Sequence, residues 1–190
     1  MGKRTFMERG MKNKRYRKTE EAILKVFFDE NERGITMQKM AKKAKIGRST
    51  MYIHHHAIRE ILPDYERYIL REYGLIMKKK LRKKNTSLRS LYLDTLLFIL
   101  RNKKIFAMFL KFGDREIVIR MIGRLEDKVS IAMRFPKNSE KIFRIYASEV
   151  AEIIFEWGEK GFSDRELEKI LSDIIYLTET SRARLMPINQ

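Results

Sequence analysis

Residues 36–56 read TMQKMAKKAKIGRSTMYIHHH and contain two short helical segments separated only by Ala44–Gly47. Thr36 can cap the first helix, predicted over Met37–Lys43, and a glycine opens the second. The small Ala41 lets the two helices cross closely, and four apolar residues fix the crossing: Met40, Ala44, Ile46 and Met51. This pattern is typical of a helix-turn-helix, whose second helix enters the major groove of DNA. A helical hairpin inside a larger bundle is the alternative interpretation.

Outside this stretch, apolar residues also recur three and four positions apart, with few prolines or glycines between them. Capping signals divide the chain into about nine helices and predict an all-α fold. The other expected helices are Lys18–Glu32, a third one from Gly47 to His54–His56, Arg59–Lys83, Leu88–Arg101, Lys103–Phe112, Arg115–Arg134 capped by Asp114, one along the apolar stripe Ile142–Trp157, and one after the capping box Ser163–Glu166. Pro63 lies inside the predicted helix Arg59–Lys83, which therefore begins there or is kinked.

Positive charge is concentrated toward the N-terminal end. The net charge is +17 overall; residues 1–56 hold fifteen basic and six acidic side chains, and residues 138–190 hold seven basic and ten acidic ones. This predicts a polyanionic partner at the N-terminal end. The densest basic run, Lys78–Lys84, is interpreted as a solvated helix end, with a second anion-binding surface as the alternative.

Composition argues against several functions. Cysteine is absent, and we find neither a phosphate-cradling glycine loop nor a Ser/His/acid grouping, so neither an enzyme nor a cofactor is expected. Consecutive residues such as His54–His56 point in different directions on a helix, so no metal site is expected; packing, phosphate proximity or a pH-sensitive contact is the better interpretation. Met1–Arg17 lacks the apolar core of a signal peptide, and the longest apolar run, Leu96–Leu100, is too short for a membrane span. A soluble, cytoplasmic protein is expected.

Residues 17–62 resemble the DNA-binding domain of TetR-type bacterial transcriptional regulators. The matching positions are Ile35-Thr36, Met40-Ala41, Ala44, Ile46, Ser49-Thr50 and Tyr52, together with the basic lead-in Arg15–Lys18 and the core residues Ile23, Leu24 and Phe27. Beyond them, only the number and order of helices match. The sequence departs from the family at Lys45 in place of the turn glycine, Gly47 in place of the capping serine, His55 in place of a core phenylalanine, and Ile58 in place of a lysine whose role Arg59 could take.

The resemblance implies a DNA-binding domain at residues 1–57, including an N-terminal arm, and a helical regulatory and dimerisation domain at residues 58–190. Arg48, at the start of the recognition helix, can offer two donors to guanine, and hydroxyl groups suit phosphate oxygens. The predicted contacts to double-stranded DNA are Arg17, Lys18, Thr36, Lys45, Arg48, Ser49, Thr50, Tyr52, Ile53 and His54.

For the second domain, the resemblance implies a homodimer and a small-molecule effector. The last two helices carry wide apolar stripes, and their predicted interface residues are Phe143, Tyr146, Val150, Ile154, Trp157, Leu167, Ile170, Leu171 and Ile174. A hairpin packed only inside its own subunit is the alternative. The predicted pocket residues are Tyr65, Tyr68, Ile69, Tyr73, Phe98, Phe106, Phe109 and Phe112, although such residues also fill ordinary cores.

The functional hypothesis is a TetR-type repressor that binds a palindromic operator as a homodimer and is released by a small apolar or aromatic ligand. A DNA-binding regulator or architectural protein that answers to a protein partner, without a ligand pocket, is the first alternative. A helical protein that binds RNA or a membrane surface is the second, supported only by the net charge and the lysine cluster.

Overall fold

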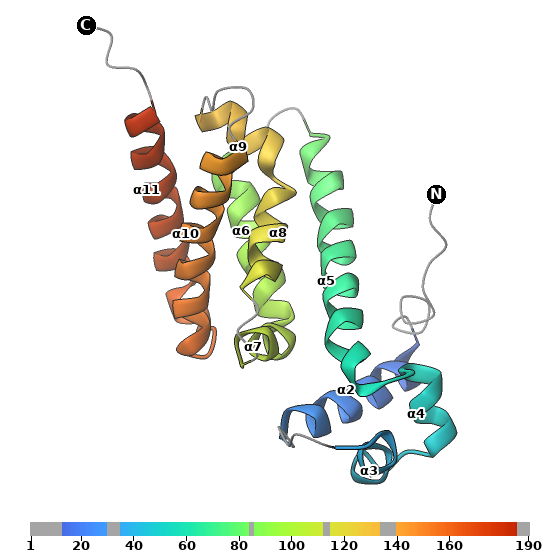
Figure 1. Ribbon diagram of the computed structural model, residues 1–190. Helices are drawn as coiled ribbons and strands as arrows, with labels where there is room; N and C mark the ends of the chain where they lie inside the picture. Colours follow the sequence, from blue (N-terminus) through green and yellow to red (C-terminus); the bar gives the residue numbers. More distant parts are fainter. Residues whose placement is uncertain (1–12, 30–34, 84–85, 112–114, 134–139, 186–190) are drawn as a thin grey trace, which may run out of the picture. The chain divides into compact units, whose positions relative to one another are not determined.

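The computed structural model describes residues 13–29, 35–83, 86–111, 115–133 and 140–185. Every regular element in these ranges is helical (Figure 1), which confirms the all-α prediction. The elements are α2 (Lys14–Asp29), α3 (Met37–Lys43), α4 (Arg48–His54), α5 (Ile58–Leu81), α6 (Leu88–Arg101), α7 (Lys103–Lys111), α8 (Glu116–Gly123), α9 (Glu126–Met133), α10 (Glu140–Glu159), the 3₁₀ turn η1 (Asp164–Glu166) and α11 (Leu167–Leu185).

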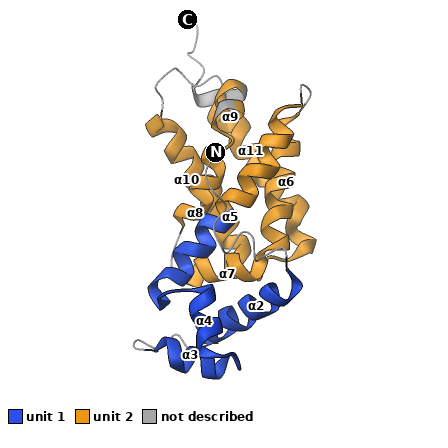
Figure 2. Cartoon of the chain, turned by 90° about the vertical axis from the view of Figure 1, so that its right-hand side faces the viewer, with its two compact units in different colours: residues 1–69 blue, residues 70–190 orange. Residues whose placement is uncertain are grey.

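The chain divides into two compact units, residues 1–69 and 70–190, coloured separately in Figure 2. The N-terminal unit contains α2, α3, α4 and the first half of α5. The C-terminal unit contains the second half of α5 and all later helices. Among the described residues, no helix combines the length and the apolar character needed to cross a membrane.

Helix α2 begins at Lys14, four residues before the predicted start. The cause is Asn13, whose Oδ1 accepts hydrogen bonds from the backbone N–H groups of Arg15 at 2.8 Å and Tyr16 at 3.4 Å. An asparagine in this position satisfies donors that have no partner inside the helix. The predicted end of this helix near Glu32 lies outside the described residues.

Several predicted boundaries agree with the structure. Helices α3 and α6 have the predicted limits, and each is capped as expected for a polar residue before a helix: Thr36 Oγ1 accepts from the N–H of Lys39 at 3.2 Å, and Ser87 Oγ accepts from that of Ser90 at 3.2 Å. Helix α5 begins at Ile58, before Pro63, so the proline lies inside the helix.

The single helix predicted over Arg115–Arg134 is wrong, because the structure forms α8 and α9 with a turn between them. Arg124 ends α8 with its N–H directed at the carbonyls of Met121 and Ile122, and the N–H of Leu125 also bonds to Ile122. Gly123 precedes this turn, and glycine is a poor helix former. The apolar spacing continues through the break into the buried Leu125, so periodicity alone did not reveal it.

The predicted capping box at Ser163–Glu166 is also absent from the structure. Ser163 makes no side-chain cap hydrogen bond, and these residues form η1 instead. The carbonyl of Ser163 accepts from Trp157 Nε1 at 3.0 Å and from the N–H of Glu166 at 3.1 Å. The turn before it places Gly161 at φ +81° and Phe162 at φ +51°, which turns the Phe162 ring into the core.

Helix α10 is central to the C-terminal unit. It packs on α7, α8 and α11, and α11 also contacts α6 and α9. Figure 1 shows α10 and α11 side by side. The Tyr146 hydroxyl lies 2.7 Å from that of Tyr92 on α6 and 2.5 Å from Thr178 Oγ1 on α11. Neutral hydroxyl groups therefore link three helices inside an apolar core.

Candidate nucleic-acid interface

The turn between α3 and α4 is closed by its own backbone. The N–H of Ile46 donates to the carbonyl of Ala41 at 3.0 Å, and that of Lys45 donates to Lys42 at 3.2 Å. This path requires Lys45 to adopt φ +55°, in the left-handed region. Lys45 stands where the TetR pattern has a turn glycine, so the resemblance anticipated this conformation. It costs a residue with a Cβ atom about 1 kcal/mol.

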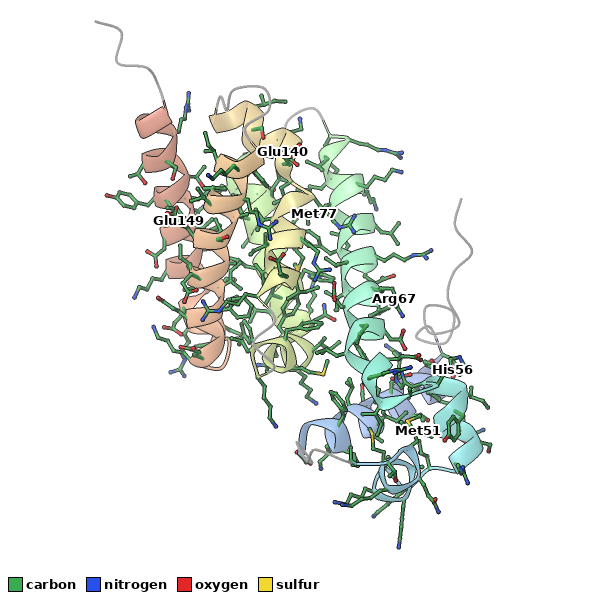
Figure 3. The ribbon with its side chains drawn as sticks, in the orientation of Figure 1. Met51, His56, Arg67, Met77, Glu140 and Glu149 are labelled. Atoms are coloured by element: carbon green, nitrogen blue, oxygen red, sulfur yellow. The ribbon has the colours of Figure 1, made fainter. Side chains whose placement is uncertain are left out.

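A small apolar core fixes the angle between α3 and α4. Met40 and Met51 are completely buried, and Ala41 is nearly so (Met51 is labelled in Figure 3). Ile23 of α2 and Ile61 of α5 are buried in the same unit. All four helices of the unit contribute to this core. Because α4 is too short to be a stable helix in isolation, tertiary packing holds it in place.

The opposite side of α4 faces solvent. Arg48 and Ser49 are exposed, Tyr52 and Ile53 retain 39% and 55% of their accessible surface, and Thr50 is half-buried. The Arg48 guanidinium lies 5.8 Å from the centre of the Tyr52 ring, a cation–π arrangement. The helix therefore offers a guanidinium, two hydroxyl-bearing side chains and an apolar residue to a binding partner.

Cationic groups elsewhere in the unit are also accessible. Arg17 and Lys18 on α2 and Lys45 in the turn are exposed, as is Thr36 at the start of α3. These four side chains and the four exposed residues of α4 are eight of the ten predicted DNA contacts, and the half-buried Thr50 is the ninth.

The tenth predicted contact, His54, points inward. Its side chain is 4% exposed, its Nδ1 donates to Glu20 Oε1 at 2.6 Å, and its ring stacks on Tyr16 with the ring centres 3.9 Å apart. A side chain held in this way is not presented on the outer face of α4, so the structure corrects this assignment.

His54 belongs to a buried polar network that sequence reasoning missed. Glu20 of α2 is 1% exposed, and its Oε2 accepts from Tyr65 Oη at 2.5 Å and from His55 Nε2 at 3.1 Å. The other ring nitrogen of His55, Nδ1, lies 3.1 Å from Asp64 Oδ2. Asp64 also pairs with the exposed Arg67. The network joins α2, the end of α4 and the first half of α5.

The network shifts the acidity of its members. Burial disfavours the charged form of Glu20, but hydrogen bonds from His54, His55 and Tyr65, with the His55 charge, hold its pKa at about 2. Burial likewise opposes protonation of His55, but hydrogen bonds and charge from Glu20 and Asp64 raise its pKa above the usual value of 6.5. Burial and the Glu20 charge raise the pKa of Tyr65 well above its usual range, so its hydroxyl stays a donor.

Two features of the sequence could have revealed this network. Glu20 lies three and four residues before the buried Ile23 and Leu24, which places a carboxylate on the apolar side of α2. His55 occupies a position where the TetR pattern has a core phenylalanine. Two polar residues at core positions of one small unit are expected to satisfy each other. Among the described residues, no group of three or more His, Cys, Asp or Glu side chains has the arrangement of a metal site.

Most of the predicted pocket residues are packed core residues in this structure. Tyr65 lies in the N-terminal unit and bonds to Glu20, whereas Tyr73 bonds to Thr95 at 2.8 Å and lies against Phe98. Phe98, Phe106 and Phe109 form a chain of ring contacts, Ile69 is fully buried and Tyr68 is half-buried. Phe112 lies outside the described residues. These rings contact one another and do not line a described cavity.

One cleft among the described residues has a different character. A cleft of about 420 Å³ is lined by Gly74, Met77, Lys78, Leu81, Arg82 and Arg124. Two of the three cationic residues belong to the Lys78–Lys84 run. Its charge suits an anion better than the apolar or aromatic ligand that the sequence predicts.

The predicted dimer residues are also buried within one chain. Phe143, Tyr146, Val150, Ile154 and Trp157 of α10 are at most 7% exposed, as are Ile170, Leu171 and Ile174 of α11, and Leu167 is half-buried. Trp157 contacts the Phe162 ring, and the Tyr146 hydroxyl bonds within its own subunit. Among the residues of these two helices whose burial the structure describes, the exposed large apolar ones are Ile142, Ile145 and Tyr176. A second copy would therefore meet these residues before the predicted stripe.

Comparisons of the chain with protein-family models, curated proteins and solved structures found no match.

Proposed function

We propose that this chain is a DNA-binding transcriptional regulator of the TetR type, a repressor that acts as a homodimer on a palindromic operator in the bacterial cytoplasm. The observation that carries the proposal is the outer face of α4. It is a short helix whose inner side is fixed by Met40 and Met51 and whose outer side leaves Arg48, Ser49 and Tyr52 exposed. A rigid support with an accessible polar face is what major-groove recognition requires.

Each exposed side chain has a role suited to its chemistry. Arg48 would donate two hydrogen bonds to O6 and N7 of a guanine, and Ile53 would contact a thymine methyl group. Lys18 and Lys45 would neutralise phosphates. Thr36 Oγ1 already accepts a hydrogen bond from the N–H of Lys39, so Thr36 would use its hydroxyl proton as a donor to a phosphate oxygen.

Two copies are needed because successive major grooves on one side of a duplex lie about 34 Å apart. We place the dimer surface on the outer faces of α10 and α11. Ile145 and Tyr176 are 55% and 71% exposed there, and Glu149 lies on the exposed side of α10 (labelled in Figure 3). Burial of these apolar residues by a partner would contribute to association.

The signal for release has two candidates. The first is a small apolar or aromatic ligand in the C-terminal unit. The second is a protein partner, and the packing of Tyr73, Phe98, Phe106 and Phe109 favours it, because an apolar ligand would have to displace rings that already contact one another.

The proposal is tested by measuring the binding of the purified chain to DNA from its own upstream region and to random duplex, at physiological salt. Tight, competitor-resistant binding with two chains per palindromic site would support it. Equal and salt-sensitive affinity for both DNAs would contradict sequence-specific recognition there and favour an architectural or RNA-binding role.

The two release signals are separated once an operator is known. A panel of apolar and aromatic compounds is added to the preformed complex, and operator occupancy is followed by fluorescence anisotropy. Release by one compound, with a matching rise in thermal stability of the free protein, would establish the ligand model. Undiminished occupancy across the panel, with release by a purified protein partner, would establish the second candidate.

A further inference from the structure

His55 has a carboxylate oxygen at each of its two ring nitrogens. Nε2 lies 3.1 Å from Glu20 Oε2, and Nδ1 lies 3.1 Å from Asp64 Oδ2. A neutral imidazole has one N–H donor and one acceptor nitrogen, and an ionised carboxylate has no proton to donate. Both contacts are therefore hydrogen bonds only when the ring carries two protons. The geometry requires the imidazolium form.

Solvent cannot hydrate a ring nitrogen of His55 that has lost its proton. The His55 side chain is fully buried, and Glu20 is 1% exposed. Removal of a ring proton would leave a nitrogen lone pair against a carboxylate oxygen in a site shielded from solvent. Such an unsatisfied buried contact is costly, because the lost interaction is not repaid by hydration.

The charges around His55 also call for a cation. Glu20 approaches the His55 ring from α2, and Asp64 and Tyr65 approach it from α5. His54 directly precedes His55 and stacks on Tyr16 of α2, and Arg67 of α5 pairs with Asp64. Two carboxylates face one imidazole, and Arg67 is 65% exposed, so solvent screens most of its charge. Loss of the His55 charge would remove a positive charge that lies 3.1 Å from the buried Glu20 carboxylate.

The position of His55 gives this charge a mechanical role. It is the residue that ends α4, and its N–H still bonds to the carbonyl of Met51 at 2.9 Å. Glu20 belongs to α2 and Asp64 to α5. One ring thus connects the C-terminal end of the candidate recognition helix to α2 and to α5.

We propose that imidazolium His55 is the clamp that fixes the end of α4 to α2 and α5, and that loss of its proton loosens α4 and weakens DNA binding. The inference rests on the proposed function for its consequence on DNA, but the clamp itself is a property of the folded N-terminal unit. DNA binding by this chain is then coupled to proton binding at a residue that touches no DNA.

The direction of the pH dependence follows from linkage. Glu20 and Asp64 raise the pKa of His55 in the folded state, so the stability that this group contributes is fully present below its unfolded value of 6.5 and is lost as the pH rises through the folded value. Glu20 behaves oppositely, since its folded pKa of about 2 lies below its usual 4.5. Both contributions are complete between pH 4.5 and 6.5, and the His55 contribution is lost on the alkaline side.

The experiment is ¹⁵N NMR of the histidine side chains in the full chain from pH 5.5 to 9.5, with urea unfolding at pH 6.5 and 9 and no DNA present. We expect both His55 nitrogens to be protonated at pH 7, as the two carboxylate contacts of the ring require. The folding equilibrium constant of the N-terminal unit should fall about tenfold for each pH unit between the pKa of His55 in the unfolded state and its pKa in the folded state.

Two variants isolate the clamp from a general pH effect. His55→Gln can still donate to a carboxylate but does not titrate, so the alkaline loss of stability should disappear; the matched control His56→Gln should keep it. Asp64→Asn removes one carboxylate and should lower the pKa of His55. If His55→Gln does not fold, the wild-type NMR titration still decides the question. A His55 ring with one protonated nitrogen at pH 7, or wild-type stability unchanged up to pH 9, would overturn the clamp.

The DNA measurement is made separately, so the two proposals can fail independently. With an alkaline loss of stability but no preference among DNA duplexes, the clamp would stand and the regulator would not. Specific binding that is equally tight at pH 6.5 and 9 in the wild-type chain would support the regulator and overturn the clamp.

Discussion

The core of the N-terminal unit contains the titratable side chains Glu20, His54 and His55, whereas the core of the C-terminal unit is linked by the neutral hydroxyl groups of Tyr92 and Tyr146. The charged network holds a helix of seven residues, α4, which lacks the length to be stable alone. The hydroxyl network lies within long helices that bury wide apolar faces. Charge at the first site fixes a short helix in one position, and it also makes that position dependent on protonation.

The largest expected effect comes from removing the shared acceptor of the charged network. Glu20→Ala leaves the donors of His54, His55 and Tyr65 without their carboxylate, and removal of one partner from a buried charged pair costs about 3–5 kcal/mol. Urea unfolding at pH 6 should show this loss in the N-terminal unit. Glu21→Ala, at an exposed neighbouring position, is the control and should change stability by less than about 0.5 kcal/mol.

The C-terminal unit should instead be most sensitive to added volume. A Cβ atom at Gly158 would overlap Leu110 Cδ1 and would lie 2.7 Å from Phe162 Cζ. Gly158→Ala is therefore expected to cost about 1–3 kcal/mol through overpacking. Gly123→Ala, where a Cβ atom meets nothing within 4 Å, is the matched control. Thermal unfolding should show a lower midpoint temperature for Gly158→Ala and no loss for Gly123→Ala. Equal losses in the two variants would contradict destabilisation by overpacking.

The hydroxyl network should respond weakly and without pH dependence. Tyr146→Phe removes the group that bridges Tyr92 and Thr178, at a cost of about 0.5–1.5 kcal/mol. Burial and the neighbouring Tyr146 raise the pKa of Tyr92 well above its usual range, so these groups stay neutral at pH 9. Urea unfolding at pH 6 and pH 9 should give the same loss. A loss that grows at pH 9 would mean that the two networks do not differ in the way described.

The smallest effect, a gain, is expected at the turn before α4. The left-handed backbone at Lys45 costs about 1 kcal/mol, and glycine removes that cost while losing about 0.5 kcal/mol of conformational entropy on folding. Lys45→Gly should thus stabilise the N-terminal unit by about 0.5 kcal/mol in urea unfolding. Lys43→Gly, inside α3, is the control and should be destabilising. A loss at both positions would argue against strain at Lys45.

The local features of the fold were predictable from sequence. Thr36 as a cap, the limits of α3 and the left-handed turn at Lys45 all depend on residues within a few positions of one another. The break between α8 and α9 was not predictable from apolar spacing, because Leu125 continues the spacing through the turn. Local chemistry thus fixed the helix ends better than it fixed where a long apolar segment bends.

The candidate site was predictable only on its outer face. Arg48 and Ser49 follow from the position of the helix start, and the structure leaves both exposed. The contact of His55 with Glu20 joins residues 35 positions apart, and neither residue type by itself predicts which partner it binds. His54 was predicted to contact DNA from its position on the last turn of the recognition helix, whereas tertiary contacts with Tyr16 and Glu20 turn it inward.

Recognition of DNA by the outer face of α4 depends above all on Arg48, so the decisive variant is Arg48→Ala. Affinities for the operator and for random duplex are measured at the same salt concentration, with Arg165→Ala, an exposed arginine in the C-terminal unit, as the control for lost charge. Arg48→Ala is expected to weaken operator binding by about 1–3 kcal/mol and to leave random-duplex binding nearly unchanged. Equal losses on both DNAs would make Arg48 a phosphate contact, and no loss on either would contradict DNA recognition by this face.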